Sequence, residues 1–269
     1  LAPASAAAQR AAALGFGAPK ARLLAPRWRA TGTAEGPEAA DYAAVLARRL
    51  SRGPDGGARF DYAGAAAEDR PALTGFIARL EATDPATLSP DARFGFWADL
   101  YNAVTLSLVL EAWPVGSIRE VRGGLLNRGP WTEKVVTVAG ARLSLDDIEH
   151  GILRPVTGDP KVHYAVNCAS IGCPDLAARP WLDAAREGGL EAALDAAART
   201  FVNHPRGARV TGGGLEVSSI YVWFREDFGG DDAGVIAHLR RHAAPLRAEA
   251  LAGVDRIAAD AYDWSINAA

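Results

Sequence analysis

The chain has 269 residues, of which 49% are hydrophobic and 23% charged, and its formal net charge is −3. This composition is ordinary for a globular protein and allows a sizeable core without crosslinks. The near-neutral charge, without any cluster of Lys and Arg, argues against nucleic-acid binding. No apolar stretch reaches the ~18 residues of a membrane-spanning helix, so we expect no transmembrane segment.

Residues 1–35 are rich in Ala, Pro, Gly and Arg and have no steady hydrophobic period. We interpret them as a tail that wraps a single domain formed by residues 36–269, with one short helix near Ser5–Leu14. The Ala-rich stretch from Leu1 to Ala13 is similar to the region around a signal-peptide cleavage site, which predicts a periplasmic or secreted location. A chain that was simply shortened at its start would explain the same stretch.

The clearest predicted element is a helix over residues 90–112. Ser89 is a favourable N-cap, Pro90 suits the first helical position, and Trp113-Pro114 ends the helix. Apolar side chains recur every three or four residues and predict one stripe that faces the core: Phe94, Trp97, Tyr101, Val104 and Leu108. Asn102 lies beside this stripe, either as an amide at the border of the core or as part of a site.

The remaining pattern mixes helices with strands. Helices are predicted over residues 38–52, 70–82, 145–153, 182–203 and 233–242, and strands over 59–62, 134–138, 161–167, 208–211, 215–217 and 254–259. Hairpin-like connections at Ala139-Gly140 and 212–214 indicate antiparallel pairing. We therefore predict a single α+β domain with a mixed, largely antiparallel sheet packed with helices. The glycine-rich nucleotide-binding and α/β-hydrolase motifs do not occur.

The segment from Val162 to Pro174 holds most of the residues that could carry chemistry. In an extended strand His163 and Asn167 share one face, and the only two cysteines, Cys168 and Cys173, follow. One interpretation is a thiolate nucleophile with His163 as its base, oriented by Asn167 or by a more distant polar group. The alternatives are a structural disulfide beside a core histidine, or a zinc half-site completed by His163 or His150, for which a set of four ligands is not evident.

A second candidate group lies on the predicted helix 145–153, which starts with the capping-box spacing of Ser144 and Asp147. Core-facing isoleucines leave Glu149 and His150 to one side of this helix, with Arg154 also polar. Glu149 is a candidate general acid or base, or the carboxylate that orients His163. The alternative is a structural salt-bridge network of Glu149 and Arg154.

Six motifs between about residue 40 and the C-terminus occur in an order that resembles a known family. They are Phe60-Asp61-Tyr62, Phe96 to Ala103, Ser144 to Arg154, Val162 to Pro174, Trp223 to Phe228 and Tyr262 to Asn267. On these motifs the chain resembles the family called domain of unknown function 547, found in bacteria and, as one module of longer proteins, in plants.

The resemblance implies no particular reaction, because the family is named for lacking one. Some plant members keep the histidine at the position of His163 but have other residues at Cys168 or Cys173. The resemblance therefore implies that the polar residues Asn102, Glu149 and His163 are shared more widely in the family than the two cysteines. Bacterial members are generally exported, and the resemblance implies no metal cofactor. A helix packed against a histidine-bearing strand is also similar to papain-like and transglutaminase-like thiol enzymes, whose helix carries the nucleophile where this chain has Asn102.

Two functions follow. The first is an extracytoplasmic thiol-dependent hydrolase or transferase acting on an amide or thioester, with Cys168 or Cys173 as nucleophile, His163 as base and Glu149 or Asn102 as orienting group. The second is a non-catalytic module in which a Cys168–Cys173 disulfide shapes a loop beside a polar pocket that captures a small polar molecule or peptide. The residues of this pocket are Asn102, Glu149, His163 and Arg154. A thiol–disulfide redox role is a third, disfavoured by four intervening residues where redox motifs have two.

Overall fold

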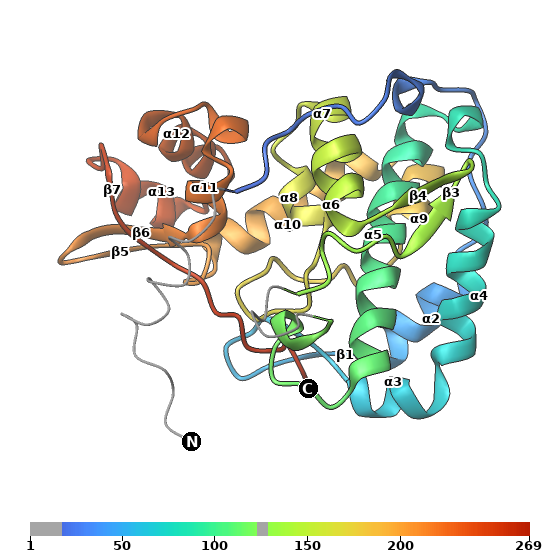
Figure 1. Cartoon of the computed structure of the whole chain (residues 1–269). Coiled ribbons are helices and arrows are strands. Elements are labelled where there is room, and N and C mark those ends of the chain that lie inside the picture. Colours follow the sequence, from blue (N-terminus) through green and yellow to red (C-terminus); the bar gives the residue numbers. More distant parts are fainter. Residues whose placement is uncertain (1–17, 123–128) are drawn as a thin grey trace. The chain divides into compact units, whose positions relative to one another are not determined.

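The computed structural model describes residues 18–122 and 129–269 (Figure 1). The helix expected near Ser5–Leu14 lies outside the described residues. The chain groups into two compact units. Of the described residues, the larger unit comprises Ala21–Ala197 and Trp264–Ala269, and the smaller unit contains Ala198–Asp263. The limits of the wrapping tail, 1–35, and of the domain, 36–269, stay predictions.

The larger unit is mostly helical, with two short hairpins. Its elements are η1 (Pro26–Arg29), α2 (Ala40–Arg49), β1 (Leu50–Arg52), β2 (Ala58–Phe60), α3 (Tyr62–Glu68), α4 (Arg70–Glu81), η2 (Pro85–Thr87), α5 (Pro90–Ala112), η3 (Ile118–Glu120), β3 (Val136–Val138), β4 (Ala141–Leu143), α6 (Leu145–Ile148), η5 (Glu149–Leu153), α7 (Arg154–Thr157), α8 (Val162–Ala165), α9 (Trp181–Arg186) and the first part of α10 (Leu190–Asn203). The label η marks 3₁₀ helices, except that η5 is a π-helix.

Helix α5 lies at the centre of the larger unit and packs against α3, α4, α9, α6 and η5 (Figure 1). Its bounds are those predicted, and the Ser89 hydroxyl accepts a hydrogen bond from the Ala92 N–H at 3.3 Å, as an N-cap does. The prediction of a single apolar stripe is too narrow, because this helix is buried around its whole circumference. Its buried polar side chains include Asp99 and Asn102, whose charged and amide groups need partners inside the core.

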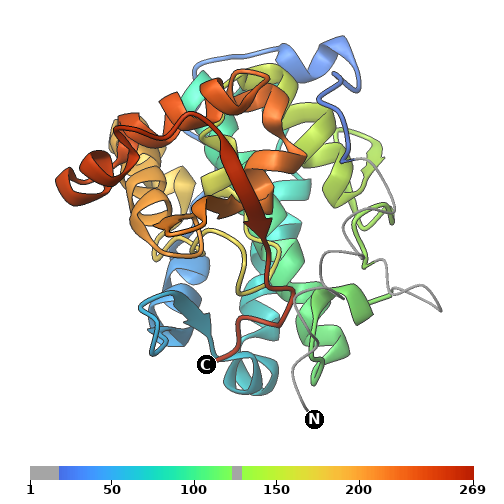
Figure 2. The same cartoon turned by 90° about the vertical axis from the view of Figure 1, so that its left-hand side faces the viewer.

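In the part of the chain that the structure describes, the strands form three small sheets, and the α+β class is confirmed. In the larger unit β1 pairs antiparallel with β2 across the turn at residues 53–57, and β3 pairs antiparallel with β4 across Ala139-Gly140. The smaller unit holds β5 (Ala208–Thr211), β6 (Gly214–Ser218), α11 (Ser219–Trp223), η6 (Arg225–Phe228), α12 (Asp232–His242), α13 (Pro245–Leu251) and β7 (Ile257–Ala261). There β6 pairs antiparallel with β5 and parallel with β7, the dark red arrow in Figure 2.

The strand predicted over residues 161–167 is wrong, because Val162–Ala165 forms the helical turn α8. The Asp159 carboxylate accepts a hydrogen bond from the Lys161 N–H at 2.8 Å, and Pro160 has the backbone angle of a first helical turn. The N–H groups of Val162 and His163 donate to the carbonyls of Asp159 and Pro160. The β-branched and aromatic residues of this segment indicate that it is buried, and burial alone does not make it a strand. The alternation that gave His163 and Asn167 a common face therefore does not apply.

Candidate functional site

The helix that starts at Ser144 changes its winding at Glu149. The predicted capping box of Ser144 and Asp147 is present, but the helix continues to Thr157 through the π-helix η5. The Arg154 N–H donates to the carbonyl five residues earlier, at Glu149. Because this bond skips His150, the His150 carbonyl loses its usual helical partner. π-Helical turns of this kind are frequent at functional sites.

The N-terminal segment of the larger unit supplies partners for the carbonyls of this π-turn. Pro155 has no N–H, so the Gly151 carbonyl also lacks a helical partner. Arg22 N donates to His150 O at 3.0 Å, and Leu24 N donates to Gly151 O at 2.8 Å. A Cβ at Gly151 would stand 3.1 Å from the Leu24 Cβ, so glycine allows this close approach.

Glu149 and His163 come together although they lie on different elements. Glu149 Oε1 is 3.6 Å from His163 Nδ1, and the two residues are 7% and 3% exposed. Burial alone raises the pKa of Glu149, but His150, His163 and Arg154 together lower that pKa to about 2. Glu149 is thus ionised near neutral pH. Of its two expected roles, this supports the carboxylate that orients His163 over a general acid.

His150 lies in the same buried group and bonds to Arg154. Arg154 Nη1 is 3.1 Å from His150 Nδ1, and an arginine can only donate, so this ring nitrogen carries no proton. The proton of the neutral ring is then on Nε2, which is 3.7 Å from Asp146 Oδ1. Because His150 is neutral, the low pKa of Glu149 depends mainly on the hydrogen bond from His163 and on the charge of Arg154.

Asp146 belongs to this group as well, although the sequence did not single it out. Burial, and after it the carboxylates of Glu149 and Asp147, together raise the pKa of Asp146 to about 7, although Lys134 opposes them. The signal in the sequence was its spacing of three residues before Glu149 and four before His150, which places all three on one side of a helix.

Both polar atoms of the Asn102 side chain form hydrogen bonds with the backbone. Its Nδ2 donates to Ala165 O at 2.9 Å, and its Oδ1 accepts from Asn167 N at 2.8 Å. Both partners lie between His163 and Cys168, so the amide clamps the chain that joins the histidine to the first cysteine. Asn102 is therefore a positioning residue, and its expected roles of orienting the imidazole or binding a ligand are not supported by these bonds.

Asp99 performs a similar task one helical turn earlier on α5. Its Oδ1 and Oδ2 accept from the N–H groups of Trp181 and Leu182 at 3.0 and 2.9 Å, at the start of α9. The indole of Trp181 donates to Ala165 O at 3.0 Å, the same carbonyl that Asn102 holds. An aspartate inside an apolar helical pattern was the signal that could have identified Asp99.

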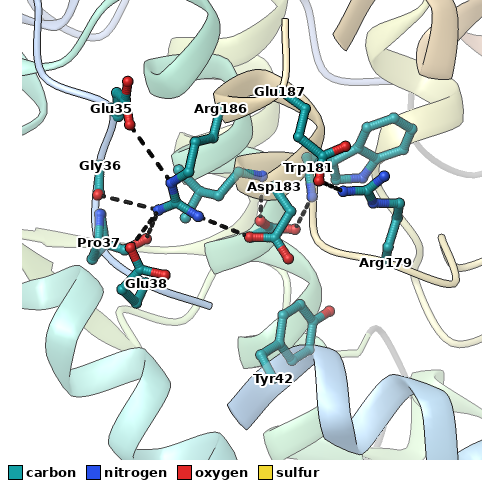
Figure 3. Close-up of polar contacts among 12 residues, drawn as sticks. Glu35, Gly36, Pro37, Glu38, Tyr42, Arg179, Trp181, Asp183, Arg186 and Glu187 are labelled. Carbon is teal, nitrogen blue, oxygen red and sulfur yellow. Dashed lines mark hydrogen bonds and ion pairs between the residues drawn. The ribbon is translucent and has the colours of Figure 1, made fainter. Parts of the chain in front are cut away.

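The other end of α9 is fixed by Arg186, which points back toward the segment Glu35–Glu38 (Figure 3). Its Nη2 donates to Pro37 O at 3.1 Å, and its Nη1 bonds Asp183 Oδ1 at 3.0 Å. Helix α9 thus has polar anchors at both ends, and the Trp181 indole is held where it meets Ala165.

Asn167 organises the loop that carries the cysteines. Its Oδ1 accepts from Ala169 N at 2.8 Å, and its Nδ2 donates to Pro174 O at 2.8 Å, so one side chain closes the loop. Ala169 has a φ of +60°, which is uncommon for a residue other than glycine. The C-terminal segment holds the loop from outside, since Ser265 O accepts from Ile171 N at 2.8 Å.

The two cysteines are free thiols in this structure. Their sulfur atoms are 2.6 Å apart, and Cys168 N donates to Cys173 Sγ at 3.0 Å. Cys168 is half-buried and Cys173 is 5% exposed. The Ser170 hydroxyl lies 3.2 Å from Cys168 Sγ. Only Cys168 therefore combines a partner hydroxyl with some access to solvent.

The hydroxyl of Tyr101, assigned by the sequence only to the core, lies near both groups. Burial raises the pKa of Tyr101 well above its ordinary value, and the charges of Glu149, Cys168, Cys173 and Asp146 raise it further. The carboxylates and the thiols thus act on one hydroxyl, which brings the Glu149–His163 pair and the cysteine loop into one neighbourhood. Within the described ranges, no group of three or more His, Cys, Asp and Glu side chains is arranged to hold a metal ion.

Comparison with known families gives one match. Residues 85–202 match the family described as Protein of unknown function, DUF547. This stretch contains α5, the π-turn and the cysteine loop, and the match supports assigning it to that family. No curated protein and no solved structure matches the chain.

Proposed function

We propose that the chain is a thiol-dependent hydrolase or transferase that acts on an amide or thioester of a small polar molecule or peptide. The observation that carries this proposal is the buried contact of Glu149 with His163 beside the cysteine loop. Cys168 is the nucleophile of the pair of cysteines, because a sulfur that attacks a substrate must be reachable and Cys173 is nearly fully buried.

The chemistry follows from the protonation states. His163 Nδ1 faces the ionised Glu149, so Nε2 is the nitrogen left to take the thiol proton. The thiolate attacks the carbonyl carbon, and the imidazolium, stabilised by the Glu149 charge, returns the proton to the leaving group. The resulting acyl group on sulfur passes to water in a hydrolase or to an acceptor nucleophile in a transferase.

Alkylation of the reduced protein tests this proposal. If His163 lowers the pKa of the Cys168 thiol, iodoacetamide labels Cys168 at pH 7 about tenfold faster than an ordinary thiol, and His163→Ala removes the advantage. His204→Ala, in the smaller unit, is the matched control and leaves the rate unchanged. Equal labelling rates in the wild type and His163→Ala would disprove the proposed role of His163.

The competing function is a non-catalytic binding module with a structural Cys168–Cys173 disulfide. It is favoured by the 2.6 Å separation of the sulfurs. In that case the folded protein isolated without reductant contains a complete disulfide, and the thiols released by reduction show ordinary reactivity. The same alkylation experiment, with and without prior reduction, separates the two functions.

An extracytoplasmic location is part of the proposal and is supported by the resemblance to exported bacterial proteins. Among the residues that the structure describes, no helix has both the length and the apolar character needed to cross a membrane. Fractionation of cells that carry the natural gene tests the location. Recovery only with cytoplasmic markers would contradict it.

A further inference from the structure

The two sulfur atoms are nearly in bonding position while the surrounding loop is already closed by other contacts. A disulfide bond is about 2.05 Å long. The separation of 2.6 Å therefore leaves only about 0.6 Å to be covered if the two thiols of Cys168 and Cys173 join. Side-chain adjustment alone can supply such a shift.

The loop does not depend on a bridge for its shape. Asn167 closes it through Ala169 N and Pro174 O, and the Ala169 carbonyl accepts from Asn267 N at 3.0 Å. Asn267 is itself held by the Tyr62 hydroxyl, which donates to its Oδ1 at 2.7 Å. Because none of these bonds involves a sulfur atom, we expect the loop to keep its conformation whether the two thiols are joined or free.

The two thiols also differ in the way an exchanging pair requires. Cys168 is half-buried, so a small disulfide can reach it, whereas Cys173 is 5% exposed. Cys173 Sγ receives the Cys168 N–H at 3.0 Å, and a hydrogen bond to sulfur favours the thiolate that must attack in the second step.

We propose that Cys168 and Cys173 form a reversible disulfide by exchange with a small-molecule disulfide, and that this bond switches off the Cys168 nucleophile. The reversible bond stands on the loop geometry alone, and only its effect on activity rests on the proposed function. The Cys168 thiolate attacks one sulfur of the small disulfide and releases the first thiol. The Cys173 thiolate then attacks the Cys168 sulfur and releases the second, so that the two protons leave on two small thiols.

The test uses the full chain in buffers of reduced and oxidised glutathione, with rapid alkylation and mass spectrometry. We expect a single transition from two alkylated cysteines to none as the oxidised fraction rises, reversed by excess dithiothreitol without denaturant. A pair that stays reduced across the series, or a disulfide that dithiothreitol opens only after unfolding, overturns the proposal.

Two matched variants test the order of attack. With oxidised glutathione, Cys173→Ser accumulates a mixed disulfide on Cys168, whereas Cys168→Ser forms the corresponding adduct at least about tenfold more slowly because Cys173 is buried. Equal rates in both variants overturn the assigned roles. The result is independent of the alkylation test above, since a reversible disulfide can form even if His163 does not accelerate labelling of Cys168.

Discussion

Replacement of Asp99 by asparagine tests how α5 holds the start of α9. Asp99 is 1% exposed, and each of its carboxylate oxygens accepts one backbone N–H, from Trp181 and from Leu182. Asparagine has a single oxygen, so one of the two N–H groups is left unpaired inside the core. An unpaired buried donor costs about 1–3 kcal/mol, which is the loss of stability expected at acidic pH.

The loss depends on pH because Asp99 titrates in an unusual range. Burial raises the pKa of Asp99 to about 7, although the N–H groups of Leu182 and Trp181 lower it and Asp183 adds a smaller increase. The native state then keeps the proton up to about pH 7, while the unfolded chain releases it near pH 4. The stability that this proton contributes is complete below pH 4 and is lost as the pH rises to 7. Between pH 5 and 8 the wild type therefore loses roughly 3 kcal/mol that Asp99→Asn does not lose.

Urea unfolding of both proteins at pH 5 and pH 8 measures this difference. Asp91→Asn is the matched control, because Asp91 lies in the first turn of the same helix and is exposed. The gap between the wild type and Asp99→Asn should narrow or change sign at pH 8, and the gap for Asp91→Asn should stay nearly constant. An equal gap at both pH values for Asp99→Asn would refute the reasoning, since it would mean that the two N–H donors keep the carboxylate ionised throughout.

Three further substitutions have defined outcomes. Tyr62→Phe removes the buried hydrogen bond to Asn267 and lowers the free energy of unfolding by about 1–2 kcal/mol in urea; unchanged stability would contradict that bond. Gly151→Val displaces Leu24, so limited proteolysis should cut the segment around Leu24 faster than in the wild type, and equal rates would disprove the contact. Glu149→Gln loses a carboxylate of pKa about 2, whose contribution is present above pH 4.5 and fades as the pH falls toward 2. The stability gap between Glu149→Gln and the wild type should thus shrink by roughly 2 kcal/mol from pH 6 to pH 3 in thermal or urea unfolding, and a constant gap would refute it.

The parts of the fold that the sequence predicted correctly depend on local signals. Ser89 and Pro90 start α5 at the predicted residue, and Ser144 with Asp147 forms the predicted capping box. The hairpin of β5 and β6 also follows its glycine-rich turn. In each case the interaction that decides the local structure joins residues only a few positions apart. A short stretch of sequence is therefore enough to predict it.

The predictions of secondary structure are wrong where the burial of a segment and its local backbone geometry favour different structures. Residues 161–167 are buried and apolar, which resembles an interior strand, yet Asp159 and Pro160 start a helical turn there. The π-turn at Glu149 was not predicted either, although Pro155 removes the donor that the Gly151 carbonyl would need in an α-helix. The His150 and Gly151 carbonyls of this turn accept hydrogen bonds from Arg22 and Leu24, which lie 128 and 127 residues earlier in the chain, and no local pattern predicts such partners.

The candidate site was located from the sequence, but the roles of its residues needed the tertiary contacts. Glu149, His150, Arg154 and His163 meet as one buried group. Asn102, grouped with them beforehand, instead bonds to the backbone of Ala165 and Asn167. The difference has a physical cause: on a helix buried all round, neighbouring side chains point in different directions and reach different segments.

Helix α5 therefore divides its polar side chains among three tasks. Asp99 holds the start of α9, Asn102 holds the chain between His163 and Cys168, and the Tyr101 hydroxyl lies near both Glu149 and the two cysteines. Asp99 and Asn102 have their polar atoms bound to backbone, so neither is arranged to act on a substrate. The reactive groups must then be those that α5 positions. In the proposed function these are His163 and the half-buried Cys168, and the long helix then fixes their separation.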